Sequence, residues 1–297
     1  MTRNRLFALA GLWAIVAACS VAMAAEKTLS RKVSPYATIV VTEDEEGLRT
    51  LRFGDNAVRQ SVVKVGDPDH IELEYAKVMP AALALVEEPR RVLVVGLGGG
   101  TIPSLLHKHY PRTMIDVVDI DPGVVEAAKE FFGFREDASL HVYVEDGRRY
   151  IEKCKEPYDI IFLDAYGADS IPYELATKEF LQGVRRATAP KGVVASNVWS
   201  SGGNPLYDAM VRTYQEVFDD LYAIDVKGRG NKILLALPGQ RRLDRDDLAR
   251  RASRVSKEKQ FRFDTGEYVT SGFQRLDVKD PRARVLLDKD KAPGAER

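Results

Sequence analysis

Residues that bind metals or form disulfides are scarce in this 297-residue chain. It contains two cysteines, Cys19 and Cys154, and four histidines. His107 and His109 are two positions apart, so a helix would point them to different sides. No group of residues has the spacing of metal ligands, and we therefore expect no metal site.

A surplus of charge of either sign is also absent. The chain has 44 basic and 44 acidic side chains, which gives a formal net charge of zero. This balance excludes a broad basic surface and predicts that no nucleic acid is bound. Internal repeats and low-complexity segments are lacking as well. The hydrophobic content of 45% and the charged content of 30% are those of an ordinary globular protein.

The N-terminus has a short hydrophobic run that small residues interrupt, which disfavours a stable membrane span. Arg3 and Arg5 precede the run over residues 6–16, and Ala22-Met23-Ala24 follows it. This order is typical of a secretory signal, so we expect residues 1–24 to be a signal peptide and the protein to be exported to the periplasm.

Two alternatives remain open for this segment. Val16-Ala17-Ala18-Cys19 resembles a bacterial lipoprotein box, which would lipidate Cys19 and hold the protein at a membrane. The other alternative is an uncleaved anchor. Cleavage after Ala24 would leave Cys154 as the remaining cysteine, so the mature protein could form no internal disulfide.

A glycine cluster lies at the centre of what the sequence does contain. The apolar run Val92–Val95 is typical of a strand buried on both faces, and it leads directly into Gly96, Gly98, Gly99 and Gly100. Such a loop before a helix favours an anionic or strongly polar ligand group. The dinucleotide fingerprint requires glycine where Thr101 stands, which argues against NAD.

Strand and helix patterns alternate after this loop. We expect strands at 92–96, 114–119, 140–145, 158–164 and 192–199, helices at 102–109, 123–132, 147–154, 174–187 and 205–218, and two final strands at 221–226 and 232–237. This pattern predicts an α/β, Rossmann-like parallel sheet of seven strands with a closing antiparallel hairpin. This order resembles that of S-adenosylmethionine-dependent transferases with the methyltransferase-like fold.

A small antiparallel β-domain is expected before this core. Short β-type runs at 36–41, 48–53 and 58–65 are followed by a helical pattern over 73–85, which Pro80 should end or kink. The predicted organisation is a signal peptide at 1–24, a β-domain with a linking helix at 25–88, a transferase core at 89–240, and a C-terminal helix and tail at 241–297.

Four acids stand where the predicted strands end. They are Asp119, Asp121, Asp146 and Asp164. Ligands bind at this edge of an open α/β sheet, and Asp119 follows Gly96 at about the spacing of an acid that binds ribose. Asp146, followed by Gly147, could accept a hydrogen bond from an adenine amino group. For Asp121 and Asp146, capping of the next helix is the alternative.

Residues 35–238 resemble the spermidine synthase family of aminopropyltransferases, and several stretches carry this resemblance. In the core they are Val94-Val95-Gly96-Leu97-Gly98-Gly99-Gly100, Val118-Asp119-Ile120-Asp121-Pro122, Val144-Glu145-Asp146-Gly147-Arg148 and Ile161-Phe162-Leu163-Asp164-Ala165-Tyr166. Ser34–Ile39 and Gly54–Ser61 resemble the family's β-domain, and Leu286-Leu287-Asp288 resembles its chain ending.

This resemblance implies a co-substrate that is decarboxylated S-adenosylmethionine or S-adenosylmethionine itself, and a small amine substrate. The implied co-substrate residues are Gly96, Gly98, Gly99, Gly100, Asp119, Asp121, Asp146, Gly147 and Gln60. Asp164 corresponds to the catalytic base, and Tyr166 would stack on or hydrogen-bond the amine unless it is a packed aromatic. Family members often self-associate, which implies a homodimer.

The part of the motif set that serves the amine departs from the family pattern. Thr101, Ala37 and Gly167 stand where the family has Asp, Gln and Asp, and Leu73-Glu74-Tyr75 replaces Tyr-His-Glu. Asp169, Glu174 or Glu74 could substitute for the missing acids. Three functions therefore stay open: an aminopropyltransferase, an S-adenosylmethionine-dependent methyltransferase, and a non-catalytic envelope protein that retains a nucleoside-binding cleft.

Overall fold

The computed structural model describes residues 26–55, 58–86, 88–167, 171–228 and 230–290. The expected signal peptide, its lipidation alternative at Cys19 and the candidate acid Asp169 lie outside these ranges. Within the described part of the chain, no helix is both long and apolar enough to cross a membrane.

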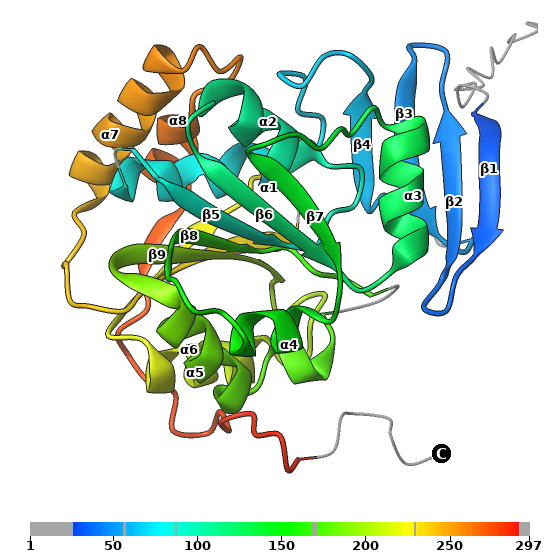
Figure 1. Ribbon diagram of the computed structural model, residues 1–297. Helices are drawn as coiled ribbons and strands as arrows, with labels where there is room; N and C mark the ends of the chain where they lie inside the picture. The colour runs from blue at the N-terminus through cyan, green and yellow to red at the C-terminus, as the bar shows by residue number, and fades with distance from the viewer. Residues whose placement is uncertain (1–25, 56–57, 87, 168–170, 229, 291–297) are drawn as a thin grey trace, which may run out of the picture.

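Four antiparallel strands form the β-domain, which we define as residues 27–64 (Figure 1). They pair in chain order: β1 (Lys27–Val33), β2 (Thr38–Glu43), β3 (Leu48–Phe53) and β4 (Ser61–Lys64). The sequence predicted three of them and missed β1. This edge strand is polar and largely exposed, so it lacks the alternating apolar pattern by which a strand is recognised.

The core contains an eight-stranded mixed sheet in the order β12-β10-β11-β9-β8-β5-β6-β7. The five strands of its parallel part are β5 (Arg91–Val95), β6 (Met114–Asp119), β7 (Leu140–Val144), β8 (Tyr158–Leu163) and β9 (Thr188–Trp199). The antiparallel part consists of β10 (Asp220–Asp225), β11 (Asn231–Leu237) and β12 (Phe273–Arg275). The expected α/β class and closing hairpin are confirmed, but the predicted count of seven strands omitted β12.

Helices cover both faces of this sheet (Figure 1). One face carries α1 (Glu74–Val78), the 3-10 helix η1 (Met79–Leu85), α2 (Thr101–His109), α3 (Pro122–Phe131), α7 (Arg245–Glu258) and α8 (Thr265–Gly272). The other carries α4 (Gly147–Glu152), the 3-10 helix η2 (Tyr173–Leu175), α5 (Lys178–Ala187) and α6 (Tyr207–Val217).

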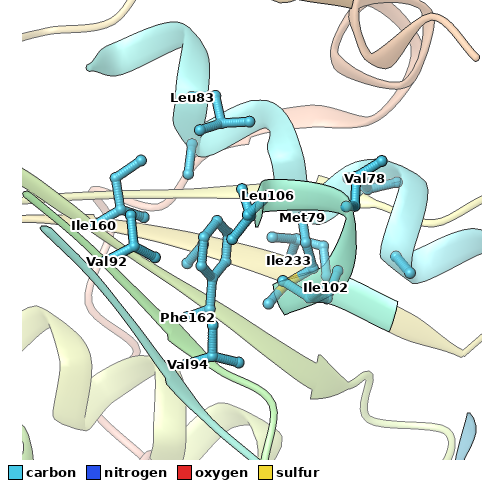
Figure 2. Close-up of a cluster of buried hydrophobic side chains, with 14 of the residues drawn as sticks. Val78, Met79, Leu83, Val92, Val94, Ile102, Leu106, Ile160, Phe162 and Ile233 are labelled. Carbon is cyan, nitrogen blue, oxygen red and sulfur yellow. The ribbon is translucent and has the colours of Figure 1, made fainter. Parts of the chain in front are cut away.

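Alternate side chains of the buried strands supply the two cores. Val92 and Val94 of β5 join the cluster drawn in Figure 2, in which Ile102 and Leu106 of α2 meet Met79 of η1. Leu93 and Val95 point to the opposite core, beneath α5 and α6. The continuous apolar run therefore reflects burial on both faces of β5.

Two of the helices expected from the sequence are each divided into two shorter elements in the structure. The expected helix over 73–85 is α-helical to Val78 and then 3-10 over Met79–Leu85, with Pro80 in its first turn. The expected helix over 174–187 is divided into η2 and α5, and Thr177 caps α5 by accepting a hydrogen bond from the backbone N–H of Phe180.

Candidate functional site

A cleft of about 810 Å³ lies over the carboxyl ends of the parallel strands and beneath part of the β-domain. It is lined by nine of the eleven residues that the sequence singled out: Gln60, Gly96, Gly98, Asp119, Asp121, Asp146, Gly147, Asp164 and Tyr166. Gly99 and Gly100 face the protein instead. They are buried against Ser61 and Phe134 and leave these side chains room to pack.

The glycine loop is shaped by contacts that exclude a side chain. Gly96 has a φ of +99°, and a Cβ atom there would collide with the carbonyl oxygen of Asp164. Gly100, at φ +82°, precedes the first residue of α2 in the left-handed region that favours glycine. The loop thus packs Gly96 closely against the end of β8, and it lines the cleft through Gly96, Leu97 and Gly98.

Asp119 is fixed by the backbone of the same loop. Its Oδ2 accepts a hydrogen bond from the N–H of Leu97 at 2.8 Å, and its Oδ1 accepts one from the N–H of Asp121 at 2.9 Å. Burial raises the pKa of Asp119 to about 6, against the lowering effect of these backbone donors. The backbone N–H of Gly98 also lowers this pKa. The lone pairs that remain on the carboxylate can accept bonds from a vicinal diol.

The other two acids at this end cap helices. Asp121 accepts a hydrogen bond from the N–H of Gly123 at 2.8 Å and another from Ser34 Oγ at 2.5 Å, so it joins α3 to the β-domain. Asp146 Oδ1 accepts bonds from the N–H groups of Arg148 and Arg149. Both therefore perform the capping role that was the alternative, and both also line the cleft. Their role in binding a ligand stays a prediction.

Asp164, at the end of β8, is held by two neutral donors. Tyr75 donates its hydroxyl to Oδ2 at 3.1 Å, and Asn197 donates its side-chain amide to Oδ1 at 2.9 Å. Burial raises the pKa of Asp164 to about 6, while Asn197 and Tyr75 lower it. Burial and the charge of Asp164 together raise the pKa of Tyr75 well above its usual value, so Tyr75 remains a donor.

Tyr166 forms the neighbouring wall. Its hydroxyl donates to the backbone carbonyl of Asn197 at 3.0 Å, and its ring centre lies 5.6 Å from that of Trp199. The Asn197 side chain is itself oriented by Asn231, whose amide donates to Asn197 Oδ1 at 2.9 Å. The phenol of Tyr166 is thus engaged within the protein, while its ring contributes to the cleft.

Sequence reasoning did not assign roles to Tyr75, Asn197 or Trp199. Asn197 and Trp199 stand at the end of the predicted strand 192–199, so the sheet-edge rule that selected the acids could have selected them too. Tyr75 was noted as a departure from the family pattern, and the structure places its hydroxyl on the carboxylate of Asp164.

The other acids around the cleft differ in their surroundings. Glu74 accepts bonds from the ammonium group of Lys77 at 2.7 Å and the hydroxyl of Tyr268 at 2.5 Å. Glu174 lies on η2 with an exposed side chain at the cleft wall. Among the residues described, no group of three or more His, Cys, Asp or Glu is arranged to hold a metal ion.

Comparison with known proteins places this geometry in a family. Residues 73–216 match the spermine/spermidine synthase domain. A polyamine aminopropyltransferase of Vibrio vulnificus (strain CMCP6) is 32% identical over 267 residues, which cover 86% of this chain and 87% of the relative.

Two solved structures share the fold. A probable spermidine synthase from Corynebacterium glutamicum ATCC 13032 has a TM-score of 0.68 at 20% identity, covering 88% of this chain and 97% of that chain. Human methyltransferase-like protein 13, solved in complex with SAH, has a TM-score of 0.58 at 30% identity, covering 64% and 93%. The extent of the match to the Vibrio relative decides between the families: this chain belongs to the spermine/spermidine synthase family of polyamine aminopropyltransferases.

Proposed function

We propose that this protein transfers the aminopropyl group of decarboxylated S-adenosylmethionine to a small amine. The observation that carries the proposal is the position of Asp164, which opens into the same cleft as Asp119 and is backed by Tyr75 and Asn197. The Asp119 carboxylate suits the nucleoside, and the Asp164 carboxylate suits the nucleophilic amine. Family membership supports a transferase reaction of this kind.

The aminopropyl donor, decarboxylated S-adenosylmethionine, is assigned to the end of the cleft that contains Asp119. Its ribose hydroxyls would donate to the lone pairs that the backbone leaves on the Asp119 carboxylate. Asp146 has a second oxygen, Oδ2, without a hydrogen bond among the described residues, and this oxygen would accept from the adenine amino group. Gln60 and the loop at Gly96 and Gly98 would contact the aminopropyl part.

The transfer step assigned to Asp164 is a displacement at the carbon beside the sulfonium. The neutral amine nitrogen forms a bond to this carbon, and the carbon–sulfur bond breaks with its electron pair left on the sulfur of methylthioadenosine. The new ammonium group loses one proton, which Asp164 accepts. Since the sulfonium is already a good leaving group, alignment of the two reactants provides much of the rate.

Methyl transfer is the second candidate. A structural neighbour at 30% identity was solved with SAH, and the same nucleoside end would accept S-adenosylmethionine. The two donors differ by one carboxylate, so they can be compared directly. Purified protein is incubated with each donor and a panel of amines, and formation of methylthioadenosine or S-adenosylhomocysteine is followed.

We expect methylthioadenosine to form from the decarboxylated donor, and Asp164→Asn to lower kcat by at least about a hundredfold while nucleoside affinity stays. S-adenosylhomocysteine as the main product would favour the methyltransferase. Stabilisation by neither donor in a thermal shift experiment would favour the non-catalytic envelope protein.

Export and self-association are separate proposals. The basic residues and apolar run before Ala24 support a cleaved signal and a periplasmic protein, with lipidation at Cys19 as the alternative that would anchor it to a membrane. Mass spectrometry of the mature N-terminus distinguishes Ala25 from a lipidated Cys19. Homodimer formation, supported by family analogy, is tested by sedimentation velocity, in which a concentration-independent monomer would contradict it.

A further inference from the structure

The end of the cleft at which the amine would bind consists mostly of aromatic and amide side chains. We call Tyr75, Asp164, Tyr166, Asn197 and Trp199 the amine end, because three hydrogen bonds and one ring contact connect them. β9 and β6 lie on opposite sides of the β8–β5 pair in the sheet. The amine end is therefore separate from the nucleoside end at Asp119.

The amine end offers one anionic partner, Asp164, which is half-buried and lines the cleft. Asp164 receives hydrogen bonds from two neutral groups, so its negative charge is left for a cationic ligand. The nearby Glu74 carboxylate is already paired with the ammonium group of Lys77. Glu174 is exposed, and solvent screens its charge. A ligand that brought a second ammonium group into this end would lose hydration with little compensation from these groups.

The remaining surface of the amine end fits an aromatic group. The Tyr166 and Trp199 rings lie 5.6 Å apart at an angle of 33°, and both line the cleft. The hydroxyl of Tyr166 is turned to the backbone of Asn197, so its ring is what a ligand meets. Leu73 and Leu175 add apolar surface to the same cleft. Aromatic pairs in such surroundings gain more than their buried area alone provides.

We infer that the acceptor is a primary amine with one cationic group and an aromatic ring, rather than an aliphatic diamine. The inference rests on the proposed aminopropyl transfer. The amine nitrogen would lie at Asp164, and the ring would lie against Tyr166 and Trp199. The ammonium group first releases one proton to water. Its neutral nitrogen then reacts as in the proposed transfer, with the second proton passing to Asp164, so no further reactant is needed.

Binding is measured without turnover through the fluorescence of Trp199. The chain contains two tryptophans, Trp13 and Trp199, so a full-length Trp13→Phe variant reports on Trp199 alone. Phenethylamine and 1,4-diaminobutane are titrated in the presence of methylthioadenosine. We expect phenethylamine to change the emission with a Kd at least about tenfold lower than that of 1,4-diaminobutane. An equal or tighter Kd for the diamine, or no response to either amine, would overturn the inference.

Variants test whether Trp199 sets the preference. The quantity compared is the ratio of kcat/KM for phenethylamine to that for butylamine, which has one ammonium group and no ring. We expect Trp199→Leu to lower this ratio by about tenfold and Trp199→Phe to retain most of it. Tyr143→Leu, at an exposed position on β7, is the matched control and should leave the ratio unchanged. An unchanged ratio in Trp199→Leu would contradict the assignment.

Failure of the two proposals can be told apart. Tight binding of phenethylamine without methylthioadenosine formation from any amine would refute the transfer reaction and keep the ligand class. Rapid aminopropyl transfer to the diamine, with weak transfer to phenethylamine, would keep the reaction and refute the ligand class.

Discussion

Asp164 combines a half-buried position at the cleft with two neutral donors, and this combination determines how its charge depends on pH. Burial favours the protonated form, whereas Asn197 and Tyr75 favour the carboxylate. The balance raises its pKa to about 6. Because Asp164 must be ionised to accept a proton, we expect the transfer rate to fall as the pH drops below this value.

Removal of a hydrogen-bond donor should raise the pKa of Asp164. In Asn197→Ala the carboxylate loses its larger stabilising partner, so the pKa of Asp164 should rise above about 6. Carbon-13 NMR of aspartate-labelled protein, with the Asp164 signal assigned through Asp164→Asn, measures the midpoint. Asn204→Ala removes an amide that does not contact Asp164 and is the control. A midpoint in Asn197→Ala at or below that of the unmodified protein would contradict this account.

Gly96 provides a second test at this scale. A methyl group at this position would collide with the Asp164 backbone, and φ +99° is strained for alanine. We expect Gly96→Ala to lower the free energy of unfolding by about 2 kcal/mol or more, measured by urea denaturation. Gly47→Ala has a similar φ of +75° with nothing within 4 Å, so it isolates the backbone strain. Equal losses in both variants would show that the collision with Asp164 has no cost.

Single residues of the site differ in how far the sequence could predict them. Asp119 and Asp164 follow from the rule that ligands bind where parallel strands end, and both line the cleft. Tyr75 reaches Asp164 from α1, 89 positions away in the chain. Spacing along the sequence carries no signal for a contact of this kind, which exists once α1 has packed beside the sheet.

Among the elements, the predictable ones are those that bury a continuous apolar face. The alternation from β5 to β11 follows the sequence pattern closely. β1 was missed because it is mostly polar, with Leu29 and Val33 as its apolar side chains, and α8 with β12 was missed because residues 261–275 show no clear period. These short elements depend on tertiary contacts: β12 pairs with β10, and α8 packs on α7.

The C-terminal segment 285–288 likewise depends on tertiary contacts. Leu286 is fully buried, its N–H donates to Thr213 Oγ1, and its carbonyl accepts the N–H of Lys178. The Leu287 carbonyl accepts the hydroxyl of Tyr173, so the segment also holds η2 at the cleft wall.

We therefore expect Leu286→Ala to destabilise the protein by about 2–5 kcal/mol, since it leaves a cavity between α5 and α6. Urea unfolding measures the loss. Val278→Ala serves as control, because Val278 is 85% exposed and its truncation should stay within about 0.5 kcal/mol. A similarly small change in Leu286→Ala would mean that the segment contributes little to the fold.

At the scale of the whole molecule, the cleft is formed where the β-domain meets the core. Ser34 bonds to Asp121, Lys32 pairs with Glu126, and Figure 1 shows α3 beside β2. Residues of both parts line the same cleft, Gln60 from the β-domain and Asp119 from the core. A ligand in the cleft contacts both parts and should therefore stabilise them together.

Methylthioadenosine, the nucleoside product of the proposed transfer, tests this coupling. At a concentration of about one hundred times its Kd it should raise the free energy of unfolding by about 2.7 kcal/mol, in a single transition reported by both parts. At the same concentration Asp119→Ala should gain clearly less, because it loses the partner of the ribose, while the exposed-site variant Val278→Ala should gain as much as the unmodified protein. If Asp119→Ala gained the full amount, the nucleoside would bind elsewhere. If the β-domain and the core melted separately in saturating ligand, a ligand in the cleft would not couple their stability.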